Sequence, residues 1–214
     1  MTPNDEDGAL VRQARQGDYA AFEALVSKYE RRLYALAVRI LGRRHDAEEV
    51  VQQTFLSVVE HLADFREEAT FYTWLMRIAT NQALALLRKR SRRATVPLGS
   101  DEREGYGDVP HPQYIAQWRE TPDEIASRRE TRQVIEQALA ELDEKYRLVF
   151  LLRDVEGLST AETAETLAIS ESNVKVRLLR ARLMLRERLT RVFGDESTRV
   201  TPHHDHGDAG GTPA

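Results

Sequence analysis

Apolar residues recur every three or four positions along most of the chain, which is the spacing of amphipathic α-helices. The clearest case is Tyr19 to Leu41, where the apolar residues share one side of the predicted helix. Asp18 precedes this segment as an N-cap candidate and Gly42 ends it. The alternation of β-branched residues that marks strands is missing, so the expected fold class is all-α.

Two further helices are predicted in the N-terminal half. One starts at Asp46 as its cap and runs to about Leu62; after a short connection the other runs from Phe71 to about Arg93, which ends a basic block. In the helix that starts at Asp46, the side that faces away from the apolar stripe carries Glu48, Glu49, Gln52, Gln53, Leu56 and Glu60. An acidic, amide-bearing face with one apolar side chain is typical of a protein-docking surface. A plain solvated face is the alternative.

The periodicity divides the chain into two helical domains. Residues 94–120 contain three prolines and three glycines, and this composition predicts a linker. Thr121-Pro122-Asp123-Glu124 then begins a helix that runs to about Leu142, and another spans Glu144 to Val155 before Gly157. The expected organisation is a disordered N-terminus (1–8), a first domain (9–93), the linker (94–120), a second domain (121–193) and a disordered tail (194–214).

The segment from Leu158 to Arg191 predicts two helices joined by a tight turn. Ser159 and Glu162 form a capping box at the start of the first helix, and Ser170 is an N-cap candidate for the second. The second helix carries seven cations against two acids, a local charge of +5 in a protein whose net charge is −4. A tight turn before a strongly cationic helix indicates a helix-turn-helix. A solvated basic face on an ordinary bundle helix is the alternative.

The phase of that cationic helix gives candidate DNA contacts. Its inward stripe is expected to be Val174, Leu178, Ala181, Leu185 and Leu189. We expect Ser172, Asn173, Val176 and Arg180 to project the opposite way, with Lys175 and Arg182 on one flank and Arg177 on the other. Arg180 would contact a guanine edge, and the methyl groups of Val176 would favour thymine. The full candidate set is Ser172, Asn173, Lys175, Val176, Arg177, Leu179, Arg180 and Arg182.

Composition narrows the function classes. The chain has no cysteine, which excludes disulfides, thiolate metal sites and a cysteine nucleophile. It has no glycine-rich phosphate loop and no histidine in a recognisable nucleophile motif, so neither an enzyme nor a cofactor is predicted. The acidic N-terminus is unlike a signal peptide, and no apolar run is long enough to insert in a membrane. His203, His204 and His206 cluster with Asp205 and could bind zinc or nickel weakly, but a solvating tail is preferred and no metal site is predicted.

From about Leu10 to Phe193 the chain resembles the extracytoplasmic-function (ECF) class of bacterial sigma factors, the sigma-70 family subunits that give RNA polymerase its promoter specificity. The matching segments are GDYAAFEALVSKYERRLYALAVRILG, DAEEVVQQTFLSVVEHL, FREEATFYTWLMRIATNQALALLRKR, and the helix-turn-helix with its lead-in LDEKYRLVFLLRDVEGLS. The resemblance implies a sigma-2 domain at 9–93 and a sigma-4 domain at 121–193. Two positions depart from the pattern: Val176 stands where relatives often have a small polar residue, and Thr163 where they have an aliphatic one.

The resemblance also implies partners and site residues. Glu48, Glu49, Gln52, Gln53 and Leu56 would bind the clamp helices of the polymerase's largest subunit, and the sigma-4 domain the flap of the second-largest. The cationic helix would recognise the −35 promoter element. Contacts to the −10 element would come from Phe65, Arg77, Asn81, Arg88, Lys89 and Arg90. An anti-sigma partner, often membrane-anchored, and a cytoplasmic location at the nucleoid are implied too. A stand-alone helix-turn-helix regulator that needs no polymerase is the alternative.

The aromatic residues near the −10 candidates allow two interpretations. Bases that leave the duplex need new stacking partners, and Phe65, Phe71, Tyr72 and Trp74 could supply them. Phe71, Trp74 and Ile78 also have the i, i+3, i+7 spacing of a core stripe, and we expect Trp74 to belong to the core. Phe65 and Asn81 are equally compatible with contacts to bases and with structural roles.

Overall fold

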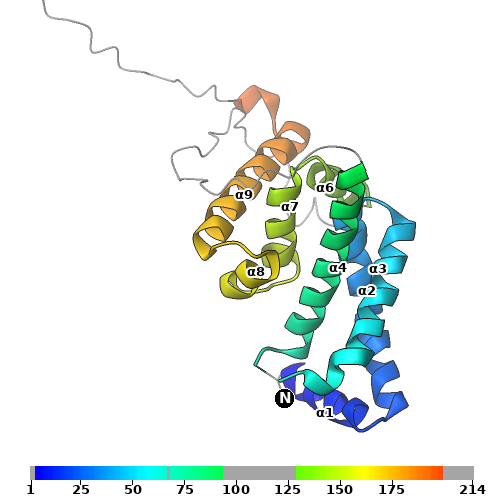
Figure 1. Cartoon of the computed structure of the whole chain (residues 1–214). Helices are drawn as coiled ribbons and strands as arrows, with labels where there is room; N and C mark the ends of the chain where they lie inside the picture. The colour runs from blue at the N-terminus through cyan, green and yellow to red at the C-terminus, as the bar shows by residue number, and fades with distance from the viewer. Residues whose placement is uncertain (1–2, 67, 94–128, 200–214) are drawn as a thin grey trace, which may run out of the picture.

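The computed structural model describes residues 3–66, 68–93 and 129–199, and every regular element in them is helical (Figure 1). The N-terminal part contains α1 (Pro3–Arg15), α2 (Tyr19–Leu41), α3 (Arg44–His61), the short turn η1 (Leu62–Asp64) and α4 (Phe71–Arg93). The C-terminal part contains α6 (Arg129–Ala140), α7 (Glu144–Phe150), the turn η3 (Leu151–Val155), α8 (Thr160–Leu167), α9 (Glu171–Phe193) and η4 (Glu196–Thr198). The predicted all-α class is confirmed. No helix among these residues is long and apolar enough to cross a membrane.

In the N-terminal part α2, α3 and α4 form a bundle, and α1 lies across the end where α2 begins (Figure 1). The side chain of Asp18 accepts hydrogen bonds from the amides of Ala20 and Ala21, and Gly42 ends α2 in the left-handed region at φ 68°. The observed bounds of α2 and of α4 agree with the predicted ones. α3 starts at Arg44, two residues before the expected cap; Asp46 instead lies in its first turn and pairs with Arg90 of α4.

The predicted disorder of residues 1–8 is wrong for residues 3–8, which begin α1. Asp7 is 6% exposed, and its carboxylate accepts hydrogen bonds from the Tyr29 hydroxyl and from Lys28 Nζ at 2.6 Å. Burial, followed by the hydrogen bond to Asp7, raises the pKa of Tyr29. These contacts attach α1 to α2. The sequence pattern alone does not predict which residues they pair.

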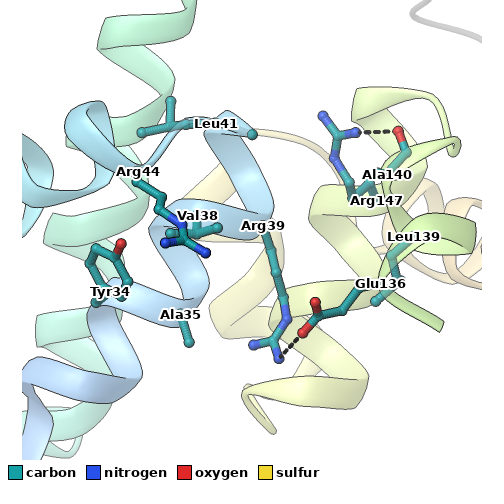
Figure 2. Close-up of a pocket in the computed structure, with 11 residues that line it drawn as sticks. Tyr34, Ala35, Val38, Arg39, Leu41, Arg44, Glu136, Leu139, Ala140 and Arg147 are labelled. Carbon is teal, nitrogen blue, oxygen red and sulfur yellow. Dashed lines mark hydrogen bonds and ion pairs between the residues drawn. The ribbon is translucent and has the colours of Figure 1, made fainter. Parts of the chain in front are cut away.

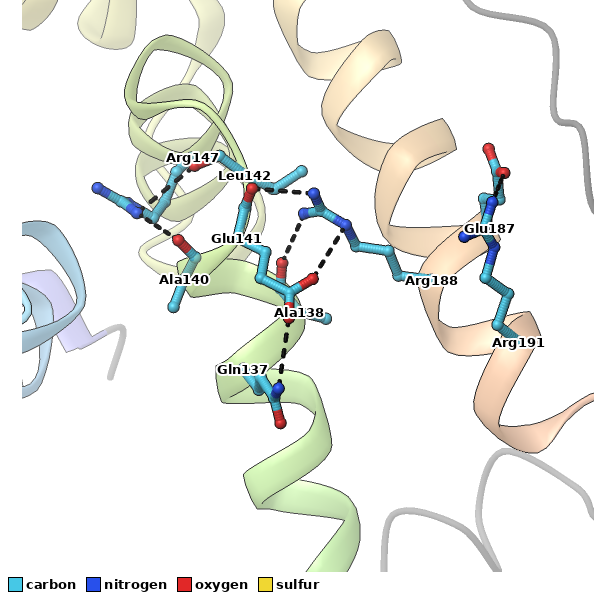
Figure 3. A network of polar contacts seen from close by, with 9 residues as sticks. All are labelled: Gln137, Ala138, Ala140, Glu141, Leu142, Arg147, Glu187, Arg188 and Arg191. Atoms are coloured by element: carbon cyan, nitrogen blue, oxygen red, sulfur yellow. Dashed lines mark hydrogen bonds and ion pairs between the residues drawn. The ribbon is translucent and has the colours of Figure 1, made fainter.

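The C-terminal part contains the predicted helix-turn-helix. The capping box of Ser159 and Glu162 is present, Ala168 makes the turn at φ 54°, and the Ser170 hydroxyl accepts from the Asn173 amide to start α9. The C-terminal half of α9 is attached to the end of α6, since Arg188 donates to the carbonyls of Ala138 at 3.1 Å and Glu141 at 2.9 Å (Figure 3).

The predicted disordered tail begins too early at residue 194. Gly194 is buried, and the carboxylate of Asp195 accepts from the Ser197 amide at 3.0 Å to start η4. Residues 194–199 are therefore ordered, while the histidine cluster of the tail lies outside the described residues.

A π-helical turn changes the direction of the chain between α7 and α8. In η3 the amide of Glu156 donates to the carbonyl of Leu151 at 2.8 Å, and Gly157 follows at φ 76°. Such insertions in a helix often occur at functional positions. Here the turn directs Glu156 towards α2 and α4 of the N-terminal part.

Candidate functional site

The predicted docking face of α3 is exposed in the structure. Glu48, Glu49, Gln52, Gln53 and Leu56 all lie on the solvent side of the helix, and Leu56 is 55% exposed. Val59, one turn after Leu56, is 60% exposed and was not among the predicted site residues. Its i+3 spacing from Leu56 could have identified it. The two side chains form an apolar pair on an otherwise acidic and amide-rich face.

Grooves lie along both sides of this α3 face. The groove between α2 and α3 has a volume of about 390 Å³ and is lined by Glu30, Arg31, Tyr34, Glu48, Val51 and Gln52. The groove between α3 and α4 has a volume of about 170 Å³ and is lined by Glu49, Val50, Gln53, Gln82, Ala85, Leu86 and Lys89. A partner could contact this face from above and from both sides. We call the exposed face of α3 the α3 ridge. Lys89, predicted to contact DNA, lies beside this ridge.

The remaining candidates on α4 divide into two groups. Arg77, Asn81 and Arg88 fall on one side of the helix, and Asn81 and Arg88 are exposed. Arg77 forms an ion pair with Glu165 of α8. Arg90 lies elsewhere, paired with Asp46 of α3. One face of α4 therefore offers an amide and two guanidinium groups along about three turns of helix.

Phe65 does not belong to that face. It is 6% exposed, with its ring centroid 5.0 Å from that of Trp74 and 6.1 Å from that of Phe71. Its assignment to the −10 contact surface is therefore wrong for this structure, because the ring already has aromatic partners in the core. The core interpretation of Phe71 and Trp74 is confirmed, since both pack in the same cluster.

The exposed face of α9 differs from the one predicted. Val176 is 2% exposed and Arg180 is 5% exposed, and Arg180 Nη1 lies 3.4 Å from the Tyr146 hydroxyl of α7. The prediction that these two side chains face outward is wrong, because α9 is contacted by α6, α7 and α8 and is not buried on a single stripe. The exposed residues that share one side are Ser172, Lys175, Leu179, Arg182 and Arg186. Arg186, absent from the predicted set, continues that side by one turn.

Two of the predicted DNA-contact residues of α9 are only partly accessible, and a third is held by an acidic partner. Asn173 and Arg177 are half-buried. Arg182 binds the carboxylate of Asp154 with two hydrogen bonds, at 2.8 and 2.7 Å, and this hydrogen bonding raises its pKa. A paired, planar guanidinium is fixed in direction and remains able to contact a phosphate at its open edge.

Comparison with known proteins shows which family this chain belongs to. The Sigma-70 region 2 model matches residues 25–93, and the Sigma-70, region 4 model matches residues 132–185. The chain is 32% identical to the RNA polymerase sigma-H factor of Pseudomonas aeruginosa, over 85% of this chain and 93% of the relative. It is 33% identical to the ECF RNA polymerase sigma factor SigW of Bacillus subtilis, over 84% of this chain and 94% of the relative. This chain belongs to the ECF sigma factors.

The fold of this ECF sigma factor agrees with that of a solved relative. CnrH, in the structure of its complex with the cytosolic domain of CnrY, superposes with a TM-score of 0.59 at 28% identity. The alignment covers 87% of this chain and 99% of CnrH. The α3 ridge and the α4 face lie in the region 2 match, and α8 with α9 up to residue 185 lies in the region 4 match. Among the described residues of this ECF sigma factor, no group of three histidine or acidic side chains is placed to hold a metal ion.

Proposed function

We propose that this protein is a promoter-specificity subunit that binds core RNA polymerase through the α3 ridge and promoter DNA through α4 and α9. The observation that carries the proposal is the separation of charge: an acidic ridge with an exposed apolar pair in one half, and a cationic helix face in the other. Acidic side chains repel a polyanion, so the ridge suits a protein partner. Family membership supports core polymerase as that partner, and we propose that the ridge binds the clamp helices of its largest subunit and that the sigma-4 part binds the flap of its second-largest subunit.

The DNA contacts follow from the exposed side of α9. Ser172 and Lys175 lie in its first turns, the part of a recognition helix that enters the major groove. Arg182 and Arg186 continue the same side and would contact the phosphate backbone. The α4 face, with Arg77, Asn81 and Arg88, would hold the −10 element.

The wider role follows from the family. Sigma factors supply specificity and no catalytic group, so the protein would act as an initiation factor in the cytoplasm and not as an enzyme. CnrH was solved with the cytosolic domain of CnrY, and RpoE was solved with the anti-sigma factor NepR from Bartonella quintana. By analogy we propose an anti-sigma partner for this chain.

Transcription with purified components tests the proposal. Core polymerase and this protein together should initiate at specific sites on a genomic DNA library, and the mapped starts should share −35 and −10 elements. A stand-alone regulator would instead retain promoter binding when core polymerase is omitted. Site-specific binding that does not change on addition of core enzyme would overturn the proposal.

Lys175→Ala should weaken binding of the holoenzyme to all promoters about equally. Lys175 is exposed on the side of α9 that we propose faces DNA, and we assign its ammonium group to a phosphate contact. Loss of one phosphate contact reduces the magnitude of the negative slope of log K, the binding constant, against log salt concentration by about one unit. Filter binding over a range of salt concentrations measures that slope. Arg191→Ala, at the opposite end of α9, is the matched control and should leave the slope unchanged.

Asn81→Ala should leave core binding intact and reduce formation of the open promoter complex. The amide of Asn81 is exposed and can both donate to and accept from one base edge. Its loss should cost about 1–3 kcal/mol in the melted complex. Permanganate reactivity of the −10 thymines reports this directly. Gln133→Ala removes an exposed amide from α6 and should not change the reactivity; an equal effect of both variants would assign Asn81 a structural role.

A further inference from the structure

A cavity lies between the C-terminal half of α2 and the helices α6 and α7 (Figure 2). Its volume is about 640 Å³. Sites that bind small molecules in proteins commonly enclose about 300–1,000 Å³. None of the lining residues is among those assigned above to polymerase or to DNA, so the proposed function gives this cavity no role.

Both walls of the cavity contribute apolar side chains. These are Ala35, Val38 and Leu41 from α2, and Leu139 and Ala140 from α6. Leu41 and Leu139 are nearly buried, on opposite walls of the cavity. An apolar group placed between the two walls would leave water and would remove the remaining exposed surface of these side chains from water as well. The cavity therefore favours a ligand with an apolar body.

The same cavity is positively charged. Its lining includes Arg39, Arg44 and Arg147 but only one acid, Glu136, so three positive charges minus one negative charge leave +2. The Glu136 carboxylate is 4.0 Å from Arg39 Nη2, and an ion pair at that distance between partly exposed groups contributes little. Arg44 is also the first residue of α3, so the positive end of that helix dipole adds to the charge. The cavity therefore favours an anion.

Two of these guanidinium groups retain hydrogen-bond donors for a ligand. Arg147 Nη1 donates to the carbonyl of Ala140 at 2.9 Å and Nη2 lies 3.5 Å from the carbonyl of Ile40, while the buried Nε has no partner among the described residues. Figure 2 shows Arg44 without a polar contact to the other residues drawn. Planar guanidinium groups bind the oxygens of carboxylates and phosphates with paired hydrogen bonds, which makes these two arginines suitable for such a group.

We propose that this cavity binds a small anionic amphiphile, a molecule with one carboxylate or phosphate group on an apolar body. Arg39, Arg44 and Arg147 would hold the anionic group, and the apolar body would lie between the walls formed by Leu41 and Leu139. An inorganic anion would leave the apolar walls in contact with water, and a neutral apolar molecule would leave the arginines without a counter-charge. The proposal is independent of the proposed function, because it uses no residue assigned to polymerase or to DNA.

Equilibrium dialysis of the full-length protein against three probes tests the site. Naphthyl phosphate carries both the anionic group and an apolar body, inorganic phosphate carries the anionic group alone, and naphthylmethanol carries the apolar body alone. Naphthyl phosphate should bind with one molecule per chain and at least about tenfold more tightly than either of the other probes, because only this probe uses both parts of the cavity. Equal affinity for naphthyl phosphate and one of the partial probes would overturn the proposal, and so would the absence of binding by all three.

Two neighbouring arginines place the binding in this cavity. Arg44→Gln should weaken the binding of naphthyl phosphate about tenfold, because it removes an exposed guanidinium that lines the cavity and leaves the core intact. Arg43→Gln is the matched control, since Arg43 is equally exposed but is not part of the lining, and it should change the affinity less than about twofold.

Ala35→Phe places a ring in the cavity and should abolish the binding of naphthyl phosphate, with circular dichroism to show that the variant is folded. If that variant does not fold, the comparison of Arg44→Gln with Arg43→Gln decides the question. Equal affinities of these two arginine variants would show that naphthyl phosphate binds elsewhere and would overturn the proposal. Transcription by the holoenzyme tests the proposed function separately.

Discussion

The double substitution Glu49→Lys, Leu56→Ala is expected to abolish formation of the holoenzyme without unfolding the protein. Both side chains are exposed on the α3 ridge, so neither contributes much to the core. An apolar side chain at the centre of an interface contributes about 2 kcal/mol or more to the binding free energy. Reversing the charge of Glu49 adds electrostatic repulsion, because the partner's surface is expected to be complementary to an acidic side chain. Together the losses weaken binding to core polymerase by about a hundredfold or more.

Co-elution with core enzyme measures this loss. The control is Glu23→Lys with Tyr19→Ala, which likewise reverses an exposed acid and truncates an exposed apolar side chain, but on the first turns of α2 and outside both proposed polymerase contacts. The control should elute with core enzyme as the wild type does. Co-elution of the α3 variant at wild-type levels would show that the ridge is not the polymerase contact.

Leu75→Ala should lower the free energy of unfolding by about 2–5 kcal/mol, the largest stability effect we predict. Leu75 has no exposed surface and lies in the core cluster beneath the −10 face of α4. Truncation leaves a cavity that the surrounding helices can fill only in part. Urea unfolding followed by circular dichroism gives the change.

Leu56→Ala is the matched control for this prediction, because the same atoms are removed from a side chain that is 55% exposed. It should cost less than about 0.5 kcal/mol. The pair separates two roles for leucine in one bundle: Leu75 stabilises the fold and Leu56 is available to a partner. Equal losses from the two substitutions would contradict the exposure of the α3 ridge.

Local interactions explain why much of the fold was predictable from the sequence. The Asp18 cap, the capping box of Ser159 and Glu162, and Gly42 all act within four residues, so the helix ends they define follow from the order of residues alone. The exposed face of α3 was predictable for a similar reason, since the helical period fixes which of its side chains share a side.

Long-range packing explains which features of the fold and of the site could not be predicted from the sequence. Val176 and Arg180 lie opposite the apolar stripe of α9, but the neighbours that bury them depend on how the helices are arranged. Asp7 is ordered by Tyr29, which is 22 residues away, and Arg77 by Glu165, which is 88 residues away. Phe65 was equally compatible with core and DNA until the positions of Phe71 and Trp74 were known.

The π-helical turn η3 links two tasks in a single short segment. Asp154, inside it, binds Arg182 of the recognition helix, while Glu156, two residues later, binds Arg32 and Tyr72 in the other half of the protein. One residue gained or lost in this turn would rotate the helix-turn-helix relative to α7 by about 100° and disturb both attachments together. The setting of the recognition helix and the packing of the two halves against each other therefore depend on the same few residues, so an insertion or deletion there would alter both at once.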